Sequence, residues 1–380
     1  MKVMVGIPCL MTGGTEIQTL NLVRALVAAG HEVVTVCYFE HSTAMVRNYE
    51  MAGSRVVLMS QDGERPIGVK NTSMALFKGF RRILQMEHPD VAHVQYMAPG
   101  AIPIMILWLL GVKRIVATAH TAADIYPSLG LLHFVSRYML TAFQCITLRA
   151  EESFFGTSRL YSPEIKLSRR SNHFTIYNNL PPYITISDHA KVHSKPLTIG
   201  VVSRLEPIKG MDLVVPAFAE VHARYADTRL LVVGDGSQRQ LMEQQAEEAG
   251  VGQVVNFVGQ QEQSVLQGFY DQIDILLMPS RSEGFGLTAI EGMARGCVVV
   301  AAATGGLPEV VRDGEVGLLH KPESATDIAD KVCSLVADRN MLQMLSRNAI
   351  RHVSQYSFAC YAQMIQDLYE KIAALRRNNI

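Results

Sequence analysis

The chain has 380 residues, of which 48% are apolar and 18% charged, and its formal net charge is zero. This composition excludes a mainly disordered chain, because enough apolar side chain is present for a large core. The zero net charge gives no support to wholesale nucleic-acid binding. The length favours two domains, since one domain usually takes about 100–200 residues.

The cysteines, histidines and carboxylates give no sign of a metal site. The six cysteines have no CxxC spacing, and no set of histidines or carboxylates has the spacing of metal ligands. The first residues run directly into a strand pattern, so we expect no signal peptide. The longest uncharged apolar stretch, 97–112, contains two prolines and is short for a membrane span. We therefore expect a cytoplasmic chain, either soluble or peripherally attached at the inner face of a membrane.

The first half of the chain alternates between short apolar runs and helical periodicity. The apolar runs predict strands at 3–7, 33–39, 56–59, 91–94 and 114–119, with two more at 154–158 and 175–177. Helices are predicted over 16–29 and 74–87, in a segment that ends near residue 110, and over 131–150. Alternation at this pace is typical of a parallel sheet with helices on both faces.

The second half repeats this pattern after a break. Residues 179–196 hold three prolines and show no periodicity, which indicates an interdomain linker. Apolar runs then predict further strands at 197–202, 229–233, 254–258, 275–278 and 298–301. The sequence therefore predicts an α/β protein of two doubly wound, Rossmann-like domains, 1–186 and 187–358, that face a cleft. Such sheets bind ligands at the carboxyl ends of their strands.

The stretch 280–296 reads as the glycine loop and helix of a βαβ unit. Glu283 lies in the loop and Glu291 in the first turns of the helix, where the peptide N–H groups near Gly286 are unpaired. Carboxylates beside a bare helix start can hold several hydroxyls and an anion together, as a sugar nucleotide requires. The alternative is an exposed helix carboxylate at Glu291 and a stabilising N-terminal charge at Glu283.

Two basic residues follow the first strand of the second domain. Arg204 and Lys209 are five residues apart, and a guanidinium and an ammonium at this spacing can grip a diphosphate. Alone, each would be read as a solvated surface charge. The turn containing Gly234 and a second glycine loop at 304–306 precede helices in the same manner, and each is also compatible with a plain connecting turn.

Two features of the first half are further candidates. Gly13 and Gly14 lead into a helix and could meet a phosphate or an acceptor, but the third glycine of a dinucleotide fingerprint is missing. His120 ends a predicted strand, which places it on the ligand side of the sheet. A structural role for this histidine is the alternative.

These motifs together resemble the retaining glycosyltransferases of GT-B fold, family 4. The resemblance covers nearly the whole chain and is strongest from 197 to 319. The E-x7-E signature of that family is present as Glu283 and Glu291, and 203–210 resembles its phosphate-gripping loop. The chain departs from the family pattern at Cys297, where proline is usual, and at Thr121, where an aspartate often follows the histidine.

The resemblance implies roles for the candidate residues. Glu283 would hold hydroxyls of the donor sugar, and Glu291 the ribose of the nucleotide. Arg204 and Lys209 would neutralise the diphosphate, and His120 would position the sugar or the acceptor. The remaining nucleotide contacts would come from Gly13, Gly14, Gly234, Gly284, Phe285, Gly286 and Leu287. No metal or other cofactor is then expected, and a helix within 359–380 is expected to return to the first domain.

The predicted function is retaining transfer of a sugar from a UDP- or GDP-sugar to a glycan, a lipid-linked or a small-molecule acceptor, in polysaccharide or glycoconjugate biosynthesis. One alternative is a nucleotide-sugar epimerase or phosphorylase, and another is a non-catalytic sugar-nucleotide-binding subunit. Peripheral membrane contact through the first domain is a further expectation. It rests on the stretch 97–112 and on the basic residues Lys78, Arg81, Arg82, Lys113 and Arg114.

Overall fold

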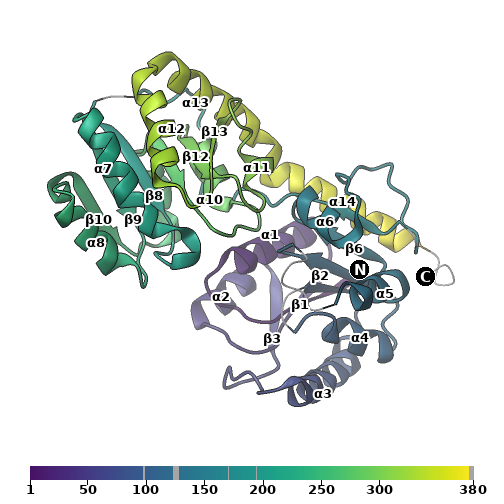
Figure 1. Ribbon diagram of the computed structural model, residues 1–380. Helices are drawn as coiled ribbons and strands as arrows, with labels where there is room; N and C mark the ends of the chain where they lie inside the picture. Colours follow the sequence, from purple (N-terminus) through teal and green to yellow (C-terminus); the bar gives the residue numbers. More distant parts are fainter. Residues whose placement is uncertain (97–98, 123–127, 170, 194, 376–380) are drawn as a thin grey trace. The chain divides into compact units, whose positions relative to one another are not determined.

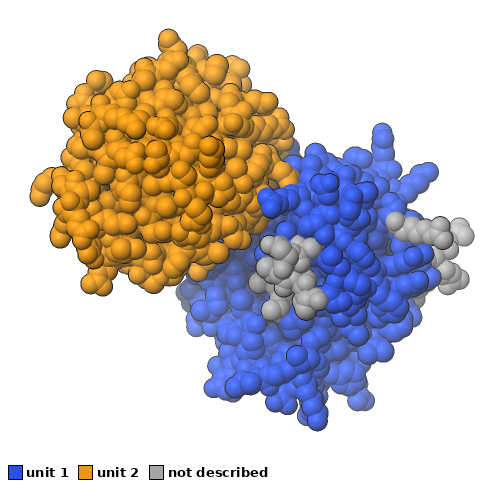
Figure 2. Space-filling model, viewed as in Figure 1, with its two compact units in different colours: residues 1–179, 358–380 blue, residues 180–357 orange. Residues whose placement is uncertain are grey.

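The computed structural model describes residues 1–96, 99–122, 128–169, 171–193 and 195–375 (Figure 1). The chain divides into two compact units, residues 1–179 with 358–380 and residues 180–357 (Figure 2). The sequence put the boundaries at 186/187 and 358/359, so the predicted linker falls almost entirely within the second unit.

The first unit is built on a parallel sheet with the strand order β3-β2-β1-β4-β5-β6-β7. Strand β1 pairs on one side with β2 and on the other with β4, and the order reverses at that point. The described strands of this sheet are β1 Lys2–Ile7, β2 Glu32–Cys37, β3 Ser54–Leu58, β4 Val91–Tyr96, β5 Ile115–Ala119, β6 Ala142–Cys145 and β7 His173–Thr175.

Helices cover both faces of this sheet. Buried side chains of α1, α2 and α14 form one core cluster with the strands, and those of α3, α4, α5 and α6 form another. The helices are α1 Gly14–Ala28, α2 Thr43–Met51, α3 Val69–Glu87, α4 Ile102–Leu109, α5 Leu129–Met139, α6 Leu148–Phe155 and α14 Phe358–Ala374. A strand such as β4 is buried throughout because it has a helix layer on each side.

Two sequence predictions in this unit are wrong. The predicted helix over 131–150 is interrupted by the buried strand β6, because Leu140 leaves the helical conformation and its backbone becomes extended. The predicted strand 154–158 instead covers the last two residues of α6 and the three residues after it. Helix α6 begins where the Thr147 side chain accepts a hydrogen bond from the N–H of Ala150. Short apolar runs do not distinguish a buried strand from a buried helix, which explains both errors.

The second unit repeats the doubly wound arrangement with six parallel strands in the order β10-β9-β8-β11-β12-β13. Its strands are β8 Leu197–Val202, β9 Thr228–Val233, β10 Val255–Gly259, β11 Ile275–Met278, β12 Val298–Ala302 and β13 Gly317–His320. Its α-helices are α7 Val214–Arg224, α8 Arg239–Glu248, α9 Leu266–Tyr270, α10 Leu287–Ala294, α11 Leu307–Val310, α12 Ala325–Ala337 and α13 Arg339–Val353. The predicted fold class, α/β with two doubly wound units, is confirmed.

Helix α14 joins the end of the chain to the first unit, as predicted. Its apolar stripe packs into the core beside α1, and the buried residues of the stripe are Tyr361, Ile365, Leu368, Tyr369 and Ile372. Among them, the hydroxyl of Tyr369 lies 2.8 Å from Nδ1 of His93, which is fully buried on β4.

Buried histidines make this unit sensitive to acid. Nε2 of His93 lies 2.6 Å from Oγ1 of Thr118, and Nε2 of His120 lies 2.6 Å from Oε1 of Gln95. Burial lowers the pKa of His93 from 6.5 to about 3 and that of His120 to about 4. Both imidazoles are therefore neutral in the folded protein at neutral pH.

We expect the free energy of unfolding to fall as the pH drops below about 6.5 and to be insensitive to these histidines above it. Between the folded and unfolded pKa values the unfolded chain binds more protons, so each histidine contributes a slope of up to ~1.4 kcal/mol per pH unit. Chemical denaturation at a series of pH values measures this slope. His93→Gln should be less stable at pH 7 but show a shallower loss between pH 6.5 and 4. An unchanged slope in that variant would contradict the assignment.

Candidate functional site

Most of the predicted site residues lie in loops at one edge of the second sheet. The loop 203–210 follows β8, the turn at 234–236 follows β9, and the loop 279–286 follows β11. Because the strands are parallel, these loops emerge at the carboxyl edge of the sheet together. The loop 303–306 after β12 joins them there.

Three glycines allow the backbones of these loops to pack directly on one another. A Cβ atom at Gly234 would overlap the carbonyl oxygen of Ser203, and one at Gly210 that of Pro279. A Cβ atom at Gly305 would overlap the carbonyl oxygen of Glu283. Each glycine also has a positive φ, of 135°, 67° and 55° respectively, which other residues rarely adopt. The backbone around Glu283 is therefore held by its neighbours.

The structure brings Lys209 and Glu283 into direct contact. Nζ of Lys209 lies 2.7 Å from Oε2 of Glu283, and both side chains are about one-fifth exposed. Lys209 ends the short 3-10 helix Pro207–Lys209, and the N–H of Gly210 after it bonds back to Pro207. Arg204, at the start of the same loop, is exposed. Hydrogen bonds from Ser237, and then the positive charge of Arg204, lower the pKa of Glu206 in that loop. The loop therefore presents two cations, of which Lys209 is in direct contact with Glu283.

Arg281 connects the loops that carry Lys209 and Glu283, and the sequence analysis did not predict this role. Its guanidinium makes a bidentate pair with Asp212 at 2.7 and 2.8 Å, and it also contacts Glu323 at 2.7 and 2.8 Å. The backbone N–H of Arg281 donates to the carbonyl of Ile208, beside Lys209. These contacts connect the loops that carry Lys209 and Glu283. No local pattern reveals them, because the partners lie far from Arg281 in the sequence.

Glu291 lies inside the unit rather than on an exposed helix face. It is 5% exposed, and its carboxylate accepts hydrogen bonds from the hydroxyls of Tyr270, at 2.6 Å, and Tyr183, at 3.1 Å. Burial raises the pKa of Glu291, while the two tyrosine hydrogen bonds lower it. Tyr270 is fully buried and Tyr183 is partly exposed, so the two hydroxyls hold the buried carboxylate from different surroundings.

The start of α10 provides hydrogen-bond donors beside these carboxylates. Gly286 caps the helix with a φ of 104°, and no side chain caps the first turn. Within the described part of the chain, the N–H groups of Leu287 and Thr288 have no backbone acceptor. Phe285 is buried edge-on against Tyr356, with 5.7 Å between the ring centroids. The start of α10 thus presents the N–H groups of Leu287 and Thr288 as available donors.

The first-unit candidates lie at the carboxyl edge of their own sheet. Gly13 is the N-cap residue of α1. The carboxylate of Glu16 packs against the Cα of Gly13 and accepts a hydrogen bond from the thiol of Cys9. A carboxylate at this helix start disfavours a phosphate there, because the two charges repel. His120 follows β5, is 8% exposed and faces Gln95 through Nε2.

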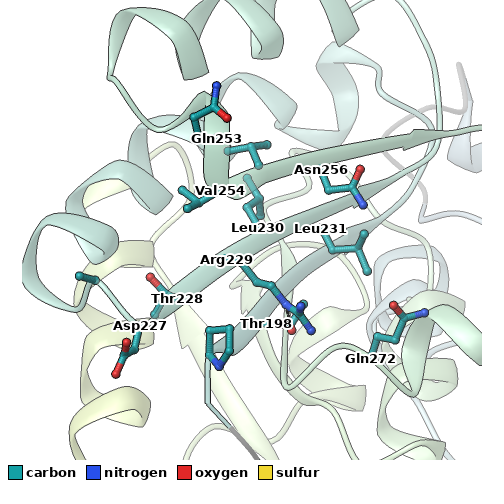
Figure 3. A pocket seen from close by; sticks show the side chains of 13 residues that line it. Thr198, Asp227, Thr228, Arg229, Leu230, Leu231, Gln253, Val254, Asn256 and Gln272 are labelled. Atoms are coloured by element: carbon teal, nitrogen blue, oxygen red, sulfur yellow. Dashed lines mark hydrogen bonds between the residues drawn. The ribbon is translucent and has the colours of Figure 1, made fainter.

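A hollow of about 480 Å³ lies at the opposite edge of the second sheet (Figure 3). It is lined by the first residues of β8, β9 and β10, including Thr198, Arg229 and Asn256, and by Gln272 before β11. Nε of Arg229 donates to Oγ1 of Thr198 at 2.7 Å. None of the predicted site residues lines this hollow, which separates it from the loops described above.

Neither a metal site nor a membrane-spanning helix is found in the described ranges. No three histidine, cysteine, aspartate or glutamate side chains gather there as a group that could hold a metal ion. No described helix combines the length and the apolar character needed to cross a bilayer.

Comparison with known families identifies both halves of the chain. Residues 185–352 match the family described as glycosyl transferases group 1, and residues 12–153 match glycosyltransferase family 4. Each half of the chain thus matches a family model of glycosyltransferases. The resemblance to family 4 glycosyltransferases that the sequence motifs indicate is therefore confirmed.

Individual relatives of this glycosyltransferase share only part of its sequence. It is 38% identical to the D-inositol 3-phosphate glycosyltransferase of Corynebacterium aurimucosum over 184 residues. These aligned residues make up 47% of this chain and 43% of that protein. The corresponding Nocardia farcinica protein is 36% identical over 178 residues, 45% of this chain and 40% of the relative. The matched region thus spans less than half the length of either curated relative.

Solved structures show the same fold across almost the whole chain. A glycosyltransferase from Rickettsia africae has a TM-score of 0.78 at 17% identity and covers 99% of both chains. The Anabaena protein HepE, solved with UDP and glucose, has a TM-score of 0.77 at 18% identity, covering 99% of this chain and all of that one.

Gly234→Ala should destabilise the second unit and weaken any ligand binding at its loops. The new methyl group meets the Ser203 carbonyl and must adopt a strained φ, which typically costs ~1–3 kcal/mol. Thermal unfolding measures the loss. Gly268→Ala is the matched control, because nothing lies near that position in α9 and alanine favours a helix by up to ~1 kcal/mol. Equal unfolding midpoints for the two variants would refute the packing argument.

Proposed function

We propose that this chain transfers a sugar from a nucleotide-diphosphate sugar to a hydroxyl acceptor with retention of the anomeric configuration. The observation that carries the proposal is the Lys209–Glu283 pair beside the bare N-terminus of α10. A cation, a carboxylate and free peptide N–H groups at one sheet edge match a diphosphate joined to a sugar. The family membership supports the same assignment.

The donor would bind by exchanging partners within this cluster. Its diphosphate would take Lys209 away from Glu283 and would also engage Arg204 and the N–H groups of Leu287 and Thr288. Glu283, released from the lysine, would then accept hydrogen bonds from sugar hydroxyls. Glu291 would accept the ribose hydroxyls in exchange for the hydrogen bond from Tyr183, the more exposed of its two tyrosine partners. Gly234 and Gly284 would allow the donor to approach the backbone closely.

Electrostatic stabilisation of the leaving group would account for most of the catalysis. Breaking the glycosidic C–O bond puts negative charge on the departing diphosphate and oxocarbenium character on the sugar. Lys209 and the start of α10 are held in place before the reaction, so they stabilise that charge with little reorganisation, and Arg204 adds a second positive charge. A leaving phosphate oxygen would take the proton of the acceptor hydroxyl on the same face, which retains the configuration. This scheme has no enzymic nucleophile and needs no metal ion.

The acceptor would bind through the first unit, at Gly13, Gly14 and His120. Glu16 at the start of α1 favours hydroxyl groups there over a phosphate. His120 is held neutral by burial, so its imidazole would position a hydroxyl without carrying charge. The relatives are named for inositol 3-phosphate, and one similar solved structure is a lipopolysaccharide galactosyltransferase. A glycan, lipid-linked or small polyol acceptor is compatible with this chain, and the lipid-linked case requires contact with a membrane.

Two other functions are separated from transfer by a product assay. A nucleotide-sugar epimerase forms its product without an acceptor, whereas a transferase requires one. A non-catalytic subunit would bind the donor and neither hydrolyse nor transfer it. The full set of charged donor groups, Arg204, Lys209, Glu283 and Glu291, favours a catalyst over a non-catalytic subunit.

Lys209→Ala and Glu283→Ala should each lower sugar transfer at least about a hundredfold, because a preorganised group that stabilises the transition state typically supplies ~3–4 kcal/mol. Transfer from radiolabelled donor measures the effect, and circular dichroism checks the fold. The exposed pair Lys195 and Asp227, 3.0 Å apart before β8 and β9, offers Lys195→Ala and Asp227→Ala as matched controls. Wild-type turnover in either site variant would refute the assigned roles.

Tyr270→Phe should raise the KM for the donor more than it lowers kcat. It removes the 2.6 Å hydrogen bond that orients Glu291 towards the ribose, and a hydrogen bond to a charged group typically contributes ~1.5–3 kcal/mol. We expect kcat/KM to fall roughly ten- to a hundredfold, as measured by initial rates against donor concentration. Tyr270 packs in the core, so the unfolding midpoint is the control. If kcat falls and KM is unchanged, Glu291 does not act in donor binding.

A further inference from the structure

Gln95 and His120 form a buried pair at the carboxyl edge of the first sheet. Gln95 lies on β4 opposite Thr118 of β5, and His120 directly follows β5. Residues 118 and 120 are two apart, so their side chains lie on the same face of the sheet as that of Gln95. Nε2 of His120 lies 2.6 Å from Oε1 of Gln95, and the two residues are 8% and 2% exposed. Water therefore competes little for this hydrogen bond.

This contact determines which ring nitrogen of His120 carries the proton. Oε1 of Gln95 is a carbonyl oxygen and has no hydrogen to donate, so Nε2 must be the donor. Burial lowers the pKa of His120 from 6.5 to about 4, so the ring holds one proton at neutral pH. Nδ1 is therefore bare and can only accept a hydrogen bond.

Three polar atoms at this edge have no hydrogen-bond partner among the described residues, which exclude 97 and 98 of the apolar stretch 97–112 and also 123–127. They are Nδ1 of His120, Oγ1 of Thr121 and Nε2 of Gln95, and the last two are buried. Folded proteins leave few buried polar groups unpaired. These atoms therefore indicate a partner that binds at this edge.

We propose that Gln95 is a positioning residue, which holds His120 in the tautomer protonated at Nε2 so that Nδ1 accepts a hydrogen bond from a substrate hydroxyl. The lone pair of Nδ1 attracts a group that has a hydrogen to donate, such as a hydroxyl or a protonated amine. It repels an oxygen that has none, such as that of a carbonyl, a carboxylate or a phosphate. This position thereby selects its ligand by the direction of the hydrogen bond.

The carboxylate of Glu16 favours the same kind of ligand. It lies at the start of α1, on the carboxyl edge of the same sheet, and accepts hydrogen bonds as a bare Nδ1 does. The hydroxyl-bearing substrate rests on the proposed function, whereas the tautomer depends only on the contact between His120 and Gln95. The two can therefore fail separately.

Nitrogen NMR of the unliganded full-length chain at pH 7, with isotopically labelled histidine, tests the tautomer. The signals of His120 are those that disappear in His120→Gln. We expect a proton on Nε2 and none on Nδ1. A proton on Nδ1, or protons on both nitrogens, would overturn the proposal.

Two probes test the selection at Nδ1 in the same spectra. Glucose, which offers hydroxyl hydrogens, should shift the Nδ1 signal of His120 as its concentration rises. Inorganic phosphate should leave that signal in place, because its oxygens meet a bare lone pair. A larger shift with phosphate than with glucose would show that the position does not select hydroxyls.

Gln95→Met removes the hydrogen-bond acceptor while it keeps the length of the side chain. The Nε2 proton of His120 should then exchange faster with solvent, and the other tautomer should become populated. In sugar transfer, kcat/KM should fall roughly three- to tenfold, as the loss of one hydrogen bond typically allows. A His120 spectrum identical to that of the wild type would contradict the role of Gln95.

Gln144→Met is the matched control, because Gln144 is similarly buried and lies on β6, opposite Thr118 from the other side. This variant should keep the wild-type spectrum of His120 and the wild-type rate of transfer. Equal losses in both variants would show a general effect on the core and overturn the proposal. The wild-type spectrum decides the tautomer even if Gln95→Met does not fold.

Discussion

Close contact between peptide backbones at the carboxyl edge of the second sheet is the constraint on which the candidate site depends. Gly210, Gly234 and Gly305 let the loops after β8, β9, β11 and β12 pack without intervening side chains. The backbone of Glu283 is thereby fixed between two neighbouring loops, and Arg281 adds a charged link between them. These contacts form without a ligand, and electrostatic catalysis depends on groups that are arranged in advance in this way.

Two of the cations at this edge are paired with carboxylates, and the two pairs have different roles. Lys209 is neutralised by Glu283, and Arg281 by Asp212 and Glu323. Lys209 and Glu283 are both proposed to bind the donor, whereas Arg281, Asp212 and Glu323 are not. A diphosphate would therefore replace Glu283 as the partner of Lys209. The pair with Asp212 instead holds the loops together. Removing Arg281 would therefore loosen the site without touching the donor.

The sequence predicted the architecture well because strand runs and helix periodicity are local signals. Both doubly wound sheets, the return of α14 and the loop positions of Lys209 and Glu283 follow from such patterns. The strand β6 was missed, since a four-residue buried strand has no periodicity of its own. The roles of Arg281, Tyr183 and Tyr270 were also missed. Their partners lie between 21 and 108 residues away, and only the folded topology brings them together.

Calorimetric titration of nucleoside diphosphates into the full-length chain tests the central claim most directly. The account predicts saturable binding of one molecule of UDP or GDP per chain. It also predicts markedly weaker binding of the corresponding monophosphate, because the second phosphate would lose its contacts with Lys209 and the start of α10. Failure of every nucleoside diphosphate to bind, or equal binding of monophosphates and diphosphates, would contradict it.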